Sequence, residues 1–211
     1  MTRIVAGSAK GRTLAVPKSG TRPTSERVRE ALFSRLDHMN VLHGATVLDL
    51  FTGTGALGLE ALSRGAARAT LVERASAAAR VATANVRATG LPAHVVTADA
   101  RTYLAARSSD TLGGEVDLVF IDPPYDIAEE DMTEVLSGLA PWIGPDSLVL
   151  VERSTRVPPP SWPTFLVLED ARTWGETVVY FAGPPLPEEH ERGDSDGCGG
   201  APASSGEEHD R

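Results

Sequence analysis

The sequence lacks the features that mark several whole classes of protein. Its 211 residues contain one cysteine, Cys198, which excludes a disulfide framework and a metal site built from several thiolates. Aromatic residues make up only 5%, no run of 18 apolar residues occurs, and the first residues lack the apolar core of a signal peptide. With 41% hydrophobic residues the chain can still bury a packed interior, so one core domain of a soluble, cytoplasmic protein is expected.

Charge is distributed unevenly along the chain. The net charge is −9, which by itself argues against a nucleic acid partner. Residues 1–40, however, carry eight lysines and arginines against three acids, whereas residues 184–211 carry eight acids against two arginines. A basic segment on an acidic body is typical of a phosphate-binding surface. An ordinary solvated surface would carry the same charges, so charge alone leaves both interpretations open.

The basic segment is predicted to form a hairpin followed by a helix. Apolar runs at 4–7 and 12–16 flank Lys10-Gly11, a pattern typical of a short β-hairpin. Further on, Thr24 or Ser25 can cap a helix. The apolar positions of that helix recur at helical spacing and are Val28, Leu32, Phe33, Leu36 and Met39.

From residue 46 the pattern changes to alternating strands and helices. This rhythm predicts a parallel sheet with helices on both faces. Strands are expected at 46–51, 69–73, 94–97, 116–121 and 147–152, and helices from 56 and at 75–89, 100–107 and 129–139.

The last β-rich runs follow a different rule. Residues 164–172 and 176–182 are separated by only three residues, too few for a parallel crossover, so an antiparallel hairpin on the sheet is expected. Beyond it, glycine, proline, serine and acids dominate, and disorder is predicted. The expected organisation is therefore a basic extension over 1–43, an α/β domain over 44–183 and an acidic tail over 184–211.

A glycine loop joins the first strand of the α/β region to its helix. Gly53, Gly55 and Gly58 match the spacing G-x-G-x-x-G, and Glu73 ends the next strand 20 residues after Gly53. Glycines allow close approach of a ligand, and an acid at that strand end suits two ribose hydroxyls. The pattern also fits a nicotinamide-dependent oxidoreductase, which is an alternative from a different enzyme class.

Three acids argue for another kind of ligand. Asp49 lies inside the strand before the glycine loop, where a carboxylate would repel a pyrophosphate but attract an ammonium group. Asp99 follows the third strand and can accept a hydrogen bond from an adenine amine, or cap the next helix, or do both. Asp122 begins the stretch 122–125, Asp-Pro-Pro-Tyr, for which hydride transfer has no evident use.

The stretch 122–125 has a chemistry of its own. It follows an apolar strand, and its two prolines fix the backbone at the carboxyl edge of the sheet, where ligands of open α/β sheets bind. Asp122 and the Pro123 carbonyl can together accept both hydrogens of an exocyclic amine. Tyr125 can stack on the face of the base that carries that amine.

These features together resemble a class I S-adenosylmethionine-dependent methyltransferase. Residues 3–7, 10–12, 22–24 and 27–33 narrow the likeness to the bacterial 16S rRNA (guanine(966)-N(2))-methyltransferase family. The resemblance covers about residues 3–183 and implies a Rossmann-like, seven-stranded, mostly parallel sheet whose last strand is antiparallel. The acidic tail departs from the family pattern.

The resemblance also implies roles for individual residues. The cofactor would be S-adenosyl-L-methionine without a metal, and the RNA partner 16S rRNA or an assembling 30S subunit, bound by a monomer. Catalysis would involve Asp122, Pro123 and Tyr125, and the cofactor would lie near Asp49, Phe51, Gly53, Gly55, Glu73, Asp99 and Ala100. Phosphate contacts are expected from Arg3, Lys10, Arg12 and Arg22. Arg27 and Arg29 are weaker candidates, because on a helix they can pair with Glu26 or Glu30.

Other substrates remain possible at this point. Amino-group methyltransferases that act on DNA adenine share the Asp-Pro-Pro-Tyr stretch, but a sequence-reading DNA enzyme normally needs a further recognition domain. Enzymes acting on protein glutamine usually carry asparagine where Asp122 stands. A non-catalytic RNA-binding protein with the same fold would have no need for an intact 122–125 stretch.

Overall fold

The structure of the protein is a computed structural model, which describes residues 2–16, 26–106 and 116–185. Several predictions lie outside the described residues: the helix caps Thr24 and Ser25, the phosphate contact Arg22, and the disorder expected in the acidic tail from residue 186 onward.

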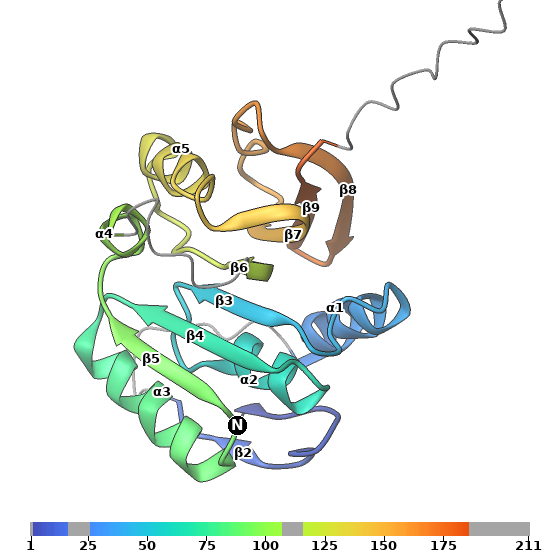
Figure 1. Ribbon diagram of the computed structural model, residues 1–211, viewed down its shortest axis with the longest axis vertical. Helices are drawn as coiled ribbons and strands as arrows, with labels where there is room; N and C mark the ends of the chain where they lie inside the picture. Colours follow the sequence, from blue (N-terminus) through green and yellow to red (C-terminus); the bar gives the residue numbers. More distant parts are fainter. Residues whose placement is uncertain (1, 17–25, 107–115, 186–211) are drawn as a thin grey trace, which may run out of the picture.

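A seven-stranded sheet forms the centre of the molecule (Figure 1). Its strands are β3 (Thr46–Leu50), β4 (Arg68–Glu73), β5 (Ala93–Thr97), β6 (Val116–Ile121), β7 (Ile143–Ser154), β8 (Val167–Trp174) and β9 (Thr177–Gly183). They lie in the order β5-β4-β3-β6-β7-β9-β8, and the strands from β5 to β7 are parallel to one another. β9 is antiparallel to both of its neighbours, which confirms the predicted mostly parallel sheet with an antiparallel last strand.

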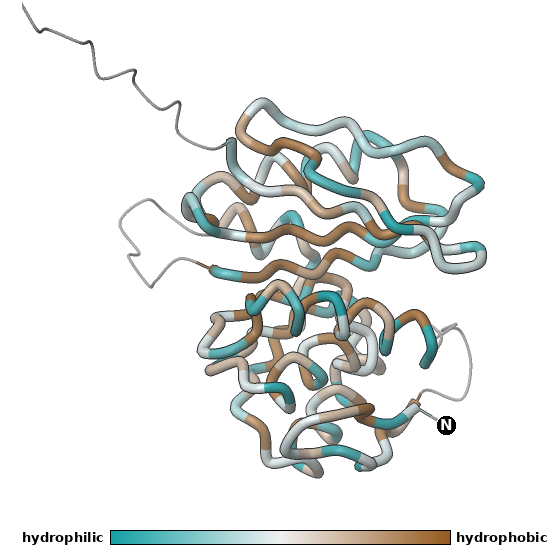
Figure 2. The backbone as a smooth tube through the Cα atoms, turned by 90° about the vertical axis from the view of Figure 1, so that its right-hand side faces the viewer, coloured by the Kyte–Doolittle hydropathy of each residue, from teal (hydrophilic) through white to brown (hydrophobic). Residues whose placement is uncertain are grey.

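Helices cover both faces of this sheet, as the strand–helix rhythm predicted. They are α1 (Glu26–His38), α2 (Ala56–Ser63), α3 (Ser76–Thr89), α4 (Ala100–Ala105) and α5 (Glu129–Ser137). Phe33 of α1 and Leu59 of α2 pack with Phe120 on one face, while Leu104 of α4 packs with Ile121 on the other. Because successive side chains of β6 point to opposite faces of the sheet, this strand contributes to a separate hydrophobic core on each face. Figure 2 shows the hydrophobic residues concentrated along these central strands.

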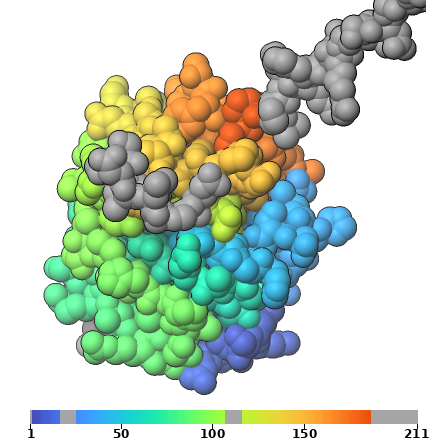
Figure 3. All heavy atoms as spheres, viewed as in Figure 1, coloured from blue at the N-terminus to red at the C-terminus, as the bar shows by residue number. Residues whose placement is uncertain are grey.

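The predicted N-terminal hairpin is present but shorter than expected. β1 (Thr2–Arg3) pairs antiparallel with β2 (Thr13–Leu14), and the intervening residues fold over α2. The ladder is short because the backbone N–H groups of Val5 and Ala6 donate to the Glu60 carboxylate, at 2.7 and 3.0 Å. Figure 3 shows this segment, in dark blue, at the opposite end of the molecule from the C-terminal strands.

Candidate active site

A cavity of about 760 Å³ opens at the carboxyl ends of the parallel strands. Its position is the one expected for ligands of open α/β sheets, and its size suits a nucleoside-sized ligand. It brings together nine of the predicted residues: Asp49, Phe51, Gly53, Glu73, Asp99, Ala100, Asp122, Pro123 and Tyr125.

The three glycines of the loop after β3 have different structural roles. Gly53 has a φ of +57°, and a Cβ built there would meet no atom within 4 Å, so its backbone faces open space. Gly55 is not part of the cavity lining; a Cβ there would lie 3.2 Å from Leu71. A Cβ on Gly58 would lie 2.3 Å from Leu71, so this glycine lets α2 pack closely on the sheet. Of the three glycines, Gly53 alone lines the cavity.

Glu73 is held in place by the backbone around it. Its Oε2 accepts from the N–H of Gly53 at 3.0 Å, and its Oε1 accepts from the N–H of Ala75 at 2.7 Å. A carboxylate has about four acceptor positions, so two remain for a ligand. The glycine loop and the end of β4 thus fix an acceptor at the cavity wall, as a pair of ribose hydroxyls would require.

Asp49 is a buried carboxyl group in β3. Burial raises its pKa to about 7, and the nearby charges of Asp122 and Glu73 add to the rise. Hydrogen bonds to its Oδ2 from the Thr52 hydroxyl (2.6 Å) and the Gly58 N–H (2.9 Å) favour ionisation but do not overcome the burial. A cation entering the cavity would restore the ionised form.

Asp99 caps the helix α4. Its Oδ1 accepts from the N–H of Arg101 at 3.0 Å and from that of Thr102 at 3.4 Å. The helix-cap interpretation of this residue is confirmed, and the side chain also lines the cavity, so a contact with a ligand stays compatible with it.

The stretch 122–125 forms part of the same cavity wall. Asp122 is half-buried, Pro123 is buried, and Tyr125 is 63% exposed. The Pro124 carbonyl accepts from the N–H of Ile127 at 3.1 Å, which closes the turn after the two prolines. Asp122 and the glycine loop therefore face one cavity. The hypothesis that Asp122 accepts a hydrogen bond from an exocyclic amine beside a bound ligand requires this arrangement.

The cavity also contains Glu152 and Arg29, to which the sequence pattern assigned no place in it. Val151 of β7 pairs with Ile121, the last residue of β6, so Glu152 within β7 and Asp122 just after β6 lie at neighbouring positions, and both line the cavity. Arg29 lines the cavity although its side chain is only 2% exposed. A signal for Arg29 existed, because it precedes Leu32 and Leu36 by three and seven residues and thus lies on the apolar face of its helix.

The candidate phosphate contacts that the structure describes do not line the cavity. Arg3, Lys10 and Arg12 are exposed. Arg3 donates from Nε to Glu26 Oε1 at 2.9 Å, and Arg12 donates from Nη1 to the Ala88 carbonyl at 2.6 Å. Exposed guanidinium groups with one such contact keep further donors for phosphates. Arg29 is not available to RNA, and its ionic partner is Glu60 rather than Glu26 or Glu30.

The described residues offer neither a metal centre nor a membrane-spanning helix. Within them, histidine, cysteine and acid side chains do not form a group of three or more that could hold a metal ion. No helix in the same ranges is long and apolar enough to cross a membrane.

Comparisons with known proteins identify the family. Residues 2–183 match the family described as conserved hypothetical protein 95. Ribosomal RNA small subunit methyltransferase D of Escherichia coli K12 is 37% identical over 178 residues, covering 83% of this chain and 86% of the relative. The putative rRNA methyltransferase YlbH of Bacillus subtilis is 33% identical, covering 84% of this chain and 96% of the relative. The structure of the putative methyltransferase yhhF from Escherichia coli aligns with a TM-score of 0.76 at 34% identity, over 88% of this chain and 98% of that one. The chain therefore belongs to the conserved hypothetical protein 95 family and is a relative of ribosomal RNA small subunit methyltransferase D, as its sequence motifs predicted.

Proposed function

We propose that this protein transfers a methyl group from S-adenosyl-L-methionine to the exocyclic N2 of a guanine in 16S ribosomal RNA. The observation that carries this proposal is the meeting of two motifs in one cavity. The glycine loop with Glu73 forms one wall, and Asp122 with Pro123 forms another. The names of the relatives, which are small subunit rRNA methyltransferases, support the same substrate.

The cavity residues fit S-adenosylmethionine. Glu73 would accept from the ribose hydroxyls, Asp99 from the adenine amine, and the Ala100 N–H would donate to the adenine ring. The open face of Gly53 would lie along the methionine part, with Phe51 beside it and Gly55 shaping the loop from the core side. Asp49 would face the ammonium group through water. When bound, the cofactor supplies a methyl group made electrophilic by a sulfonium.

Asp122 and Pro123 would act on the nucleophile, guanine N2, which is the less reactive of the two reactants. The lone pair of guanine N2 is conjugated with the ring and poorly available. Accepting both N–H bonds at Asp122 and at the Pro123 carbonyl favours a pyramidal nitrogen with a directed lone pair. Positive charge grows on that nitrogen as the N–C bond forms, and the Asp122 carboxylate stabilises it. Asp122 or a water then accepts the released proton.

Tyr125 would hold the base once it has left its stack. Its ring is exposed at the rim of the cavity, and stacking of one base on an aromatic ring contributes about 1–3 kcal/mol. Extrusion of the base, or its origin in a loop, is needed because the enzyme must reach an atom that a helix conceals.

Glu152 supports guanine over adenine as the target. The Watson–Crick edge of guanine presents N1–H beside the N2 amine. These neighbouring hydrogen-bond donors are best matched by neighbouring acceptors on the protein. Glu152 and Asp122 offer two carboxylates side by side, which suits this edge. Adenine presents an unprotonated N1 beside its amine, and a second carboxylate would repel that lone pair.

The basic N-terminal segment would bind the rRNA backbone, with Arg3, Lys10, Arg12 and Arg22 as contacts. The proposal also divides the chain into three parts: an RNA-binding extension over 1–43, a methyltransferase domain over 44–183 and a tail over 184–211. The working form would be a cytoplasmic monomer acting on 16S rRNA or an assembling 30S subunit. Large exposed apolar side chains among the described residues are few, which supports a monomer: Val16, Tyr125, Val167 and Leu168.

One experiment tests this function directly. Purified protein is incubated with labelled S-adenosylmethionine and small-subunit RNA from an unmodified source, naked or partly assembled, and the methylated base is mapped. A single N2-methylguanine is expected, and replacing that guanine by inosine, which lacks N2, should abolish labelling. Labelling of an adenine instead would overturn the proposal in favour of an adenine enzyme. Binding of a nicotinamide cofactor without methyl transfer would favour an oxidoreductase.

A further inference from the structure

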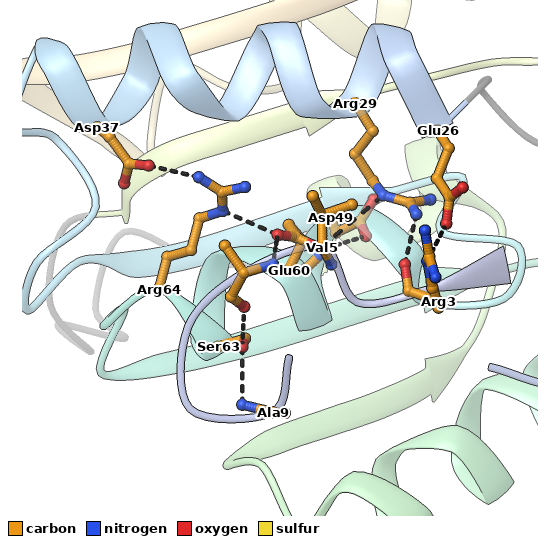
Figure 4. A network of polar contacts seen from close by, with 12 residues as sticks. Arg3, Val5, Ala9, Glu26, Arg29, Asp37, Asp49, Glu60, Ser63 and Arg64 are labelled. Atoms are coloured by element: carbon orange, nitrogen blue, oxygen red, sulfur yellow. Dashed lines mark hydrogen bonds and ion pairs between the residues drawn. The ribbon is translucent and has the colours of Figure 1, made fainter. Parts of the chain in front are cut away.

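Arg29 is a buried guanidinium at the wall of the cavity. It comes from α1, and its side chain is 2% exposed. Its Nη2 donates to the Arg3 carbonyl at 2.6 Å, while its Nε lies 3.9 Å from Glu60 Oε2 and has no hydrogen-bond partner among the described residues (Figure 4). Among the described residues, the bond to the Arg3 carbonyl is thus the one hydrogen bond that the guanidinium donates, and Glu60, its ionic partner there, lies beyond hydrogen-bond distance of Nε.

The contacts of Glu60 explain why this match is loose. The Glu60 carboxylate accepts from the N–H groups of Val5 and Ala6 and from Nε of Arg64 at 2.8 Å. Figure 4 shows Glu60 between the two arginines, with its short contacts directed to Arg64 and to the N-terminal segment. A buried cation whose nearest acid is committed elsewhere has a large desolvation cost to offset. An anionic group of a ligand would offset it.

The other charges around the cavity make Arg29 unusual. Acids dominate the lining: Asp49, Glu73, Asp99, Asp122, Asp126, Asp131 and Glu152. Of the arginines in the lining, Arg74 is exposed beside Glu73, and Arg101 is paired with Asp131 and with Glu134 at 3.1 Å. Arg29 is therefore the buried cation that the described lining offers to a negatively charged ligand group.

We propose that Arg29 binds the carboxylate at the amino-acid end of the cofactor. The inference rests on the proposed function, because it assumes S-adenosylmethionine as the ligand. That end of the cofactor carries an ammonium and a carboxylate, and the cavity offers Asp49 for the first and Arg29 for the second. A guanidinium matches a carboxylate in shape and charge, and such contacts are stronger than those between neutral groups. Arg29 is thereby a cofactor-binding residue rather than an RNA contact.

The test is a binding cycle with two ligands and the intact protein. One ligand is S-adenosylhomocysteine, and the other is the same molecule without its carboxylate, which keeps the adenosine, sulfur and amine. Isothermal titration calorimetry on the wild type should show the decarboxylated ligand binding about 10- to 100-fold more weakly. In Arg29→Gln this difference should vanish, because S-adenosylhomocysteine loses affinity while the decarboxylated ligand changes by less than about threefold.

Arg64 provides the matched control. It pairs with the same Glu60 carboxylate from α2 and is also largely buried, but it is not part of the cavity lining. Arg64→Gln should leave the difference between the two ligands unchanged, whatever it does to stability. Arg29→Lys, which keeps a positive charge without the planar fork, should retain part of the difference.

The outcomes separate the inference from the function on which it rests. If the wild type binds neither ligand, the proposed cofactor is wrong. If the wild type binds both and Arg29→Gln weakens both to the same extent, Arg29 only supports the fold and the inference is overturned. Should Arg29→Gln fail to fold, the cycle is run on Arg29→Lys. An undiminished difference between the two ligands in that variant also overturns it.

Discussion

The acidic cavity and the basic N-terminal segment differ in how their charged side chains are held. In the cavity, the carboxyl groups of Asp49 and Glu73 are held in place by hydrogen bonds from backbone N–H groups. On the N-terminal segment, Arg3, Lys10 and Arg12 project into solvent. Buried charges interact strongly and specifically, whereas exposed ones are screened and act as a sum. Single substitutions should therefore matter far more in the cavity than on the basic surface.

Beneath its exposed cations, however, the N-terminal segment is as firmly built as the cavity. Ile4 and Leu14 belong to the same hydrophobic cluster as Leu71 and Phe120 of the sheet. The Asn85 side chain of α3 accepts from the N–H of Ala15 at 2.8 Å and donates to the Thr54 carbonyl of the glycine loop at 2.9 Å. The basic surface is therefore a rigid extension of the core.

The largest effect is expected at Asp122. Asp122→Ala should lower the rate of methyl transfer by about 100- to 1,000-fold, because no carboxylate then stabilises charge on the reacting nitrogen. Single-turnover assays with labelled cofactor measure this, and calorimetry should show affinity for S-adenosylhomocysteine within about threefold of the wild type. Asp126→Ala removes an exposed acid of the same cavity and should retain most of the rate. Near-normal turnover of Asp122→Ala would refute its role.

A substitution at Gly7 should destabilise the packing beneath the basic surface. Gly7 has a φ of +82°, and a Cβ there would lie 1.7 Å from the Ser63 carbonyl oxygen. Gly7→Ala should cost about 2–4 kcal/mol of stability in thermal or urea unfolding, through both backbone strain and overlap. Gly11 is the control, since its φ is +81° but a Cβ would meet nothing within 4 Å, so Gly11→Ala should cost about 1 kcal/mol. Equal losses in both variants would show that the contact with Ser63 adds nothing.

Glu73 tests the cofactor side of the cavity. Glu73→Ala removes the proposed acceptor for two ribose hydroxyls and should weaken S-adenosylhomocysteine binding by about 10- to 100-fold. Glu73→Gln keeps one acceptor oxygen and should lose less. Calorimetry on both variants gives the comparison. An unchanged affinity in Glu73→Ala would remove this residue from the site.

We expect Asp49 to make cofactor binding depend on pH. Its pKa of about 7 lies above the ordinary 3.8, so the free protein holds a proton that an incoming ammonium group would displace. Affinity for S-adenosylhomocysteine should therefore rise up to about tenfold between about pH 6 and 8, with proton release seen by calorimetry in two buffers. For the same reason the free protein loses a stabilising contribution as the pH rises from about 4 to 7. Asp49→Asn should bind with little pH dependence, and a wild type that does the same would contradict the assignment.

The sequence predicted the elements well because they follow from local pattern. Strand β6 is an apolar run closed by two prolines, and the glycine loop needs positive φ at Gly53 and Gly55, which only glycine adopts readily. Local pattern does not reveal strain, however. Phe51 also has a positive φ, of 60°, which its side chain gives no reason to expect.

Strand order was the part of the fold that the sequence could not supply. The neighbouring positions of Asp122 and Glu152 depend on β7 lying beside β6, and residues 30 apart in the sequence show no such relation locally. The closing hairpin follows from its short connection, but the insertion of β9 between β7 and β8 does not. The charge of Arg29 suggested an RNA contact, although its spacing from Leu32 and Leu36 placed it on the buried face. The first two relations depend on tertiary packing, whereas the burial of Arg29 was already indicated by its helical spacing.

The smallest effects are expected from single cations of the basic surface. Removing one phosphate-binding cation should reduce the slope of log affinity against log salt by about 0.7 to 0.9, because one counterion fewer is released from the RNA. Lys10→Ala and Arg12→Ala should each show this in filter binding across a salt series, and the double variant should show the sum. Arg172, an exposed arginine of β8, should leave the slope unchanged when replaced by alanine, because the C-terminal strands lie at the opposite end of the molecule from the N-terminal segment. A wild-type affinity that does not vary with salt would contradict RNA binding by this surface while leaving the cavity chemistry intact, because the two regions carry separate charges.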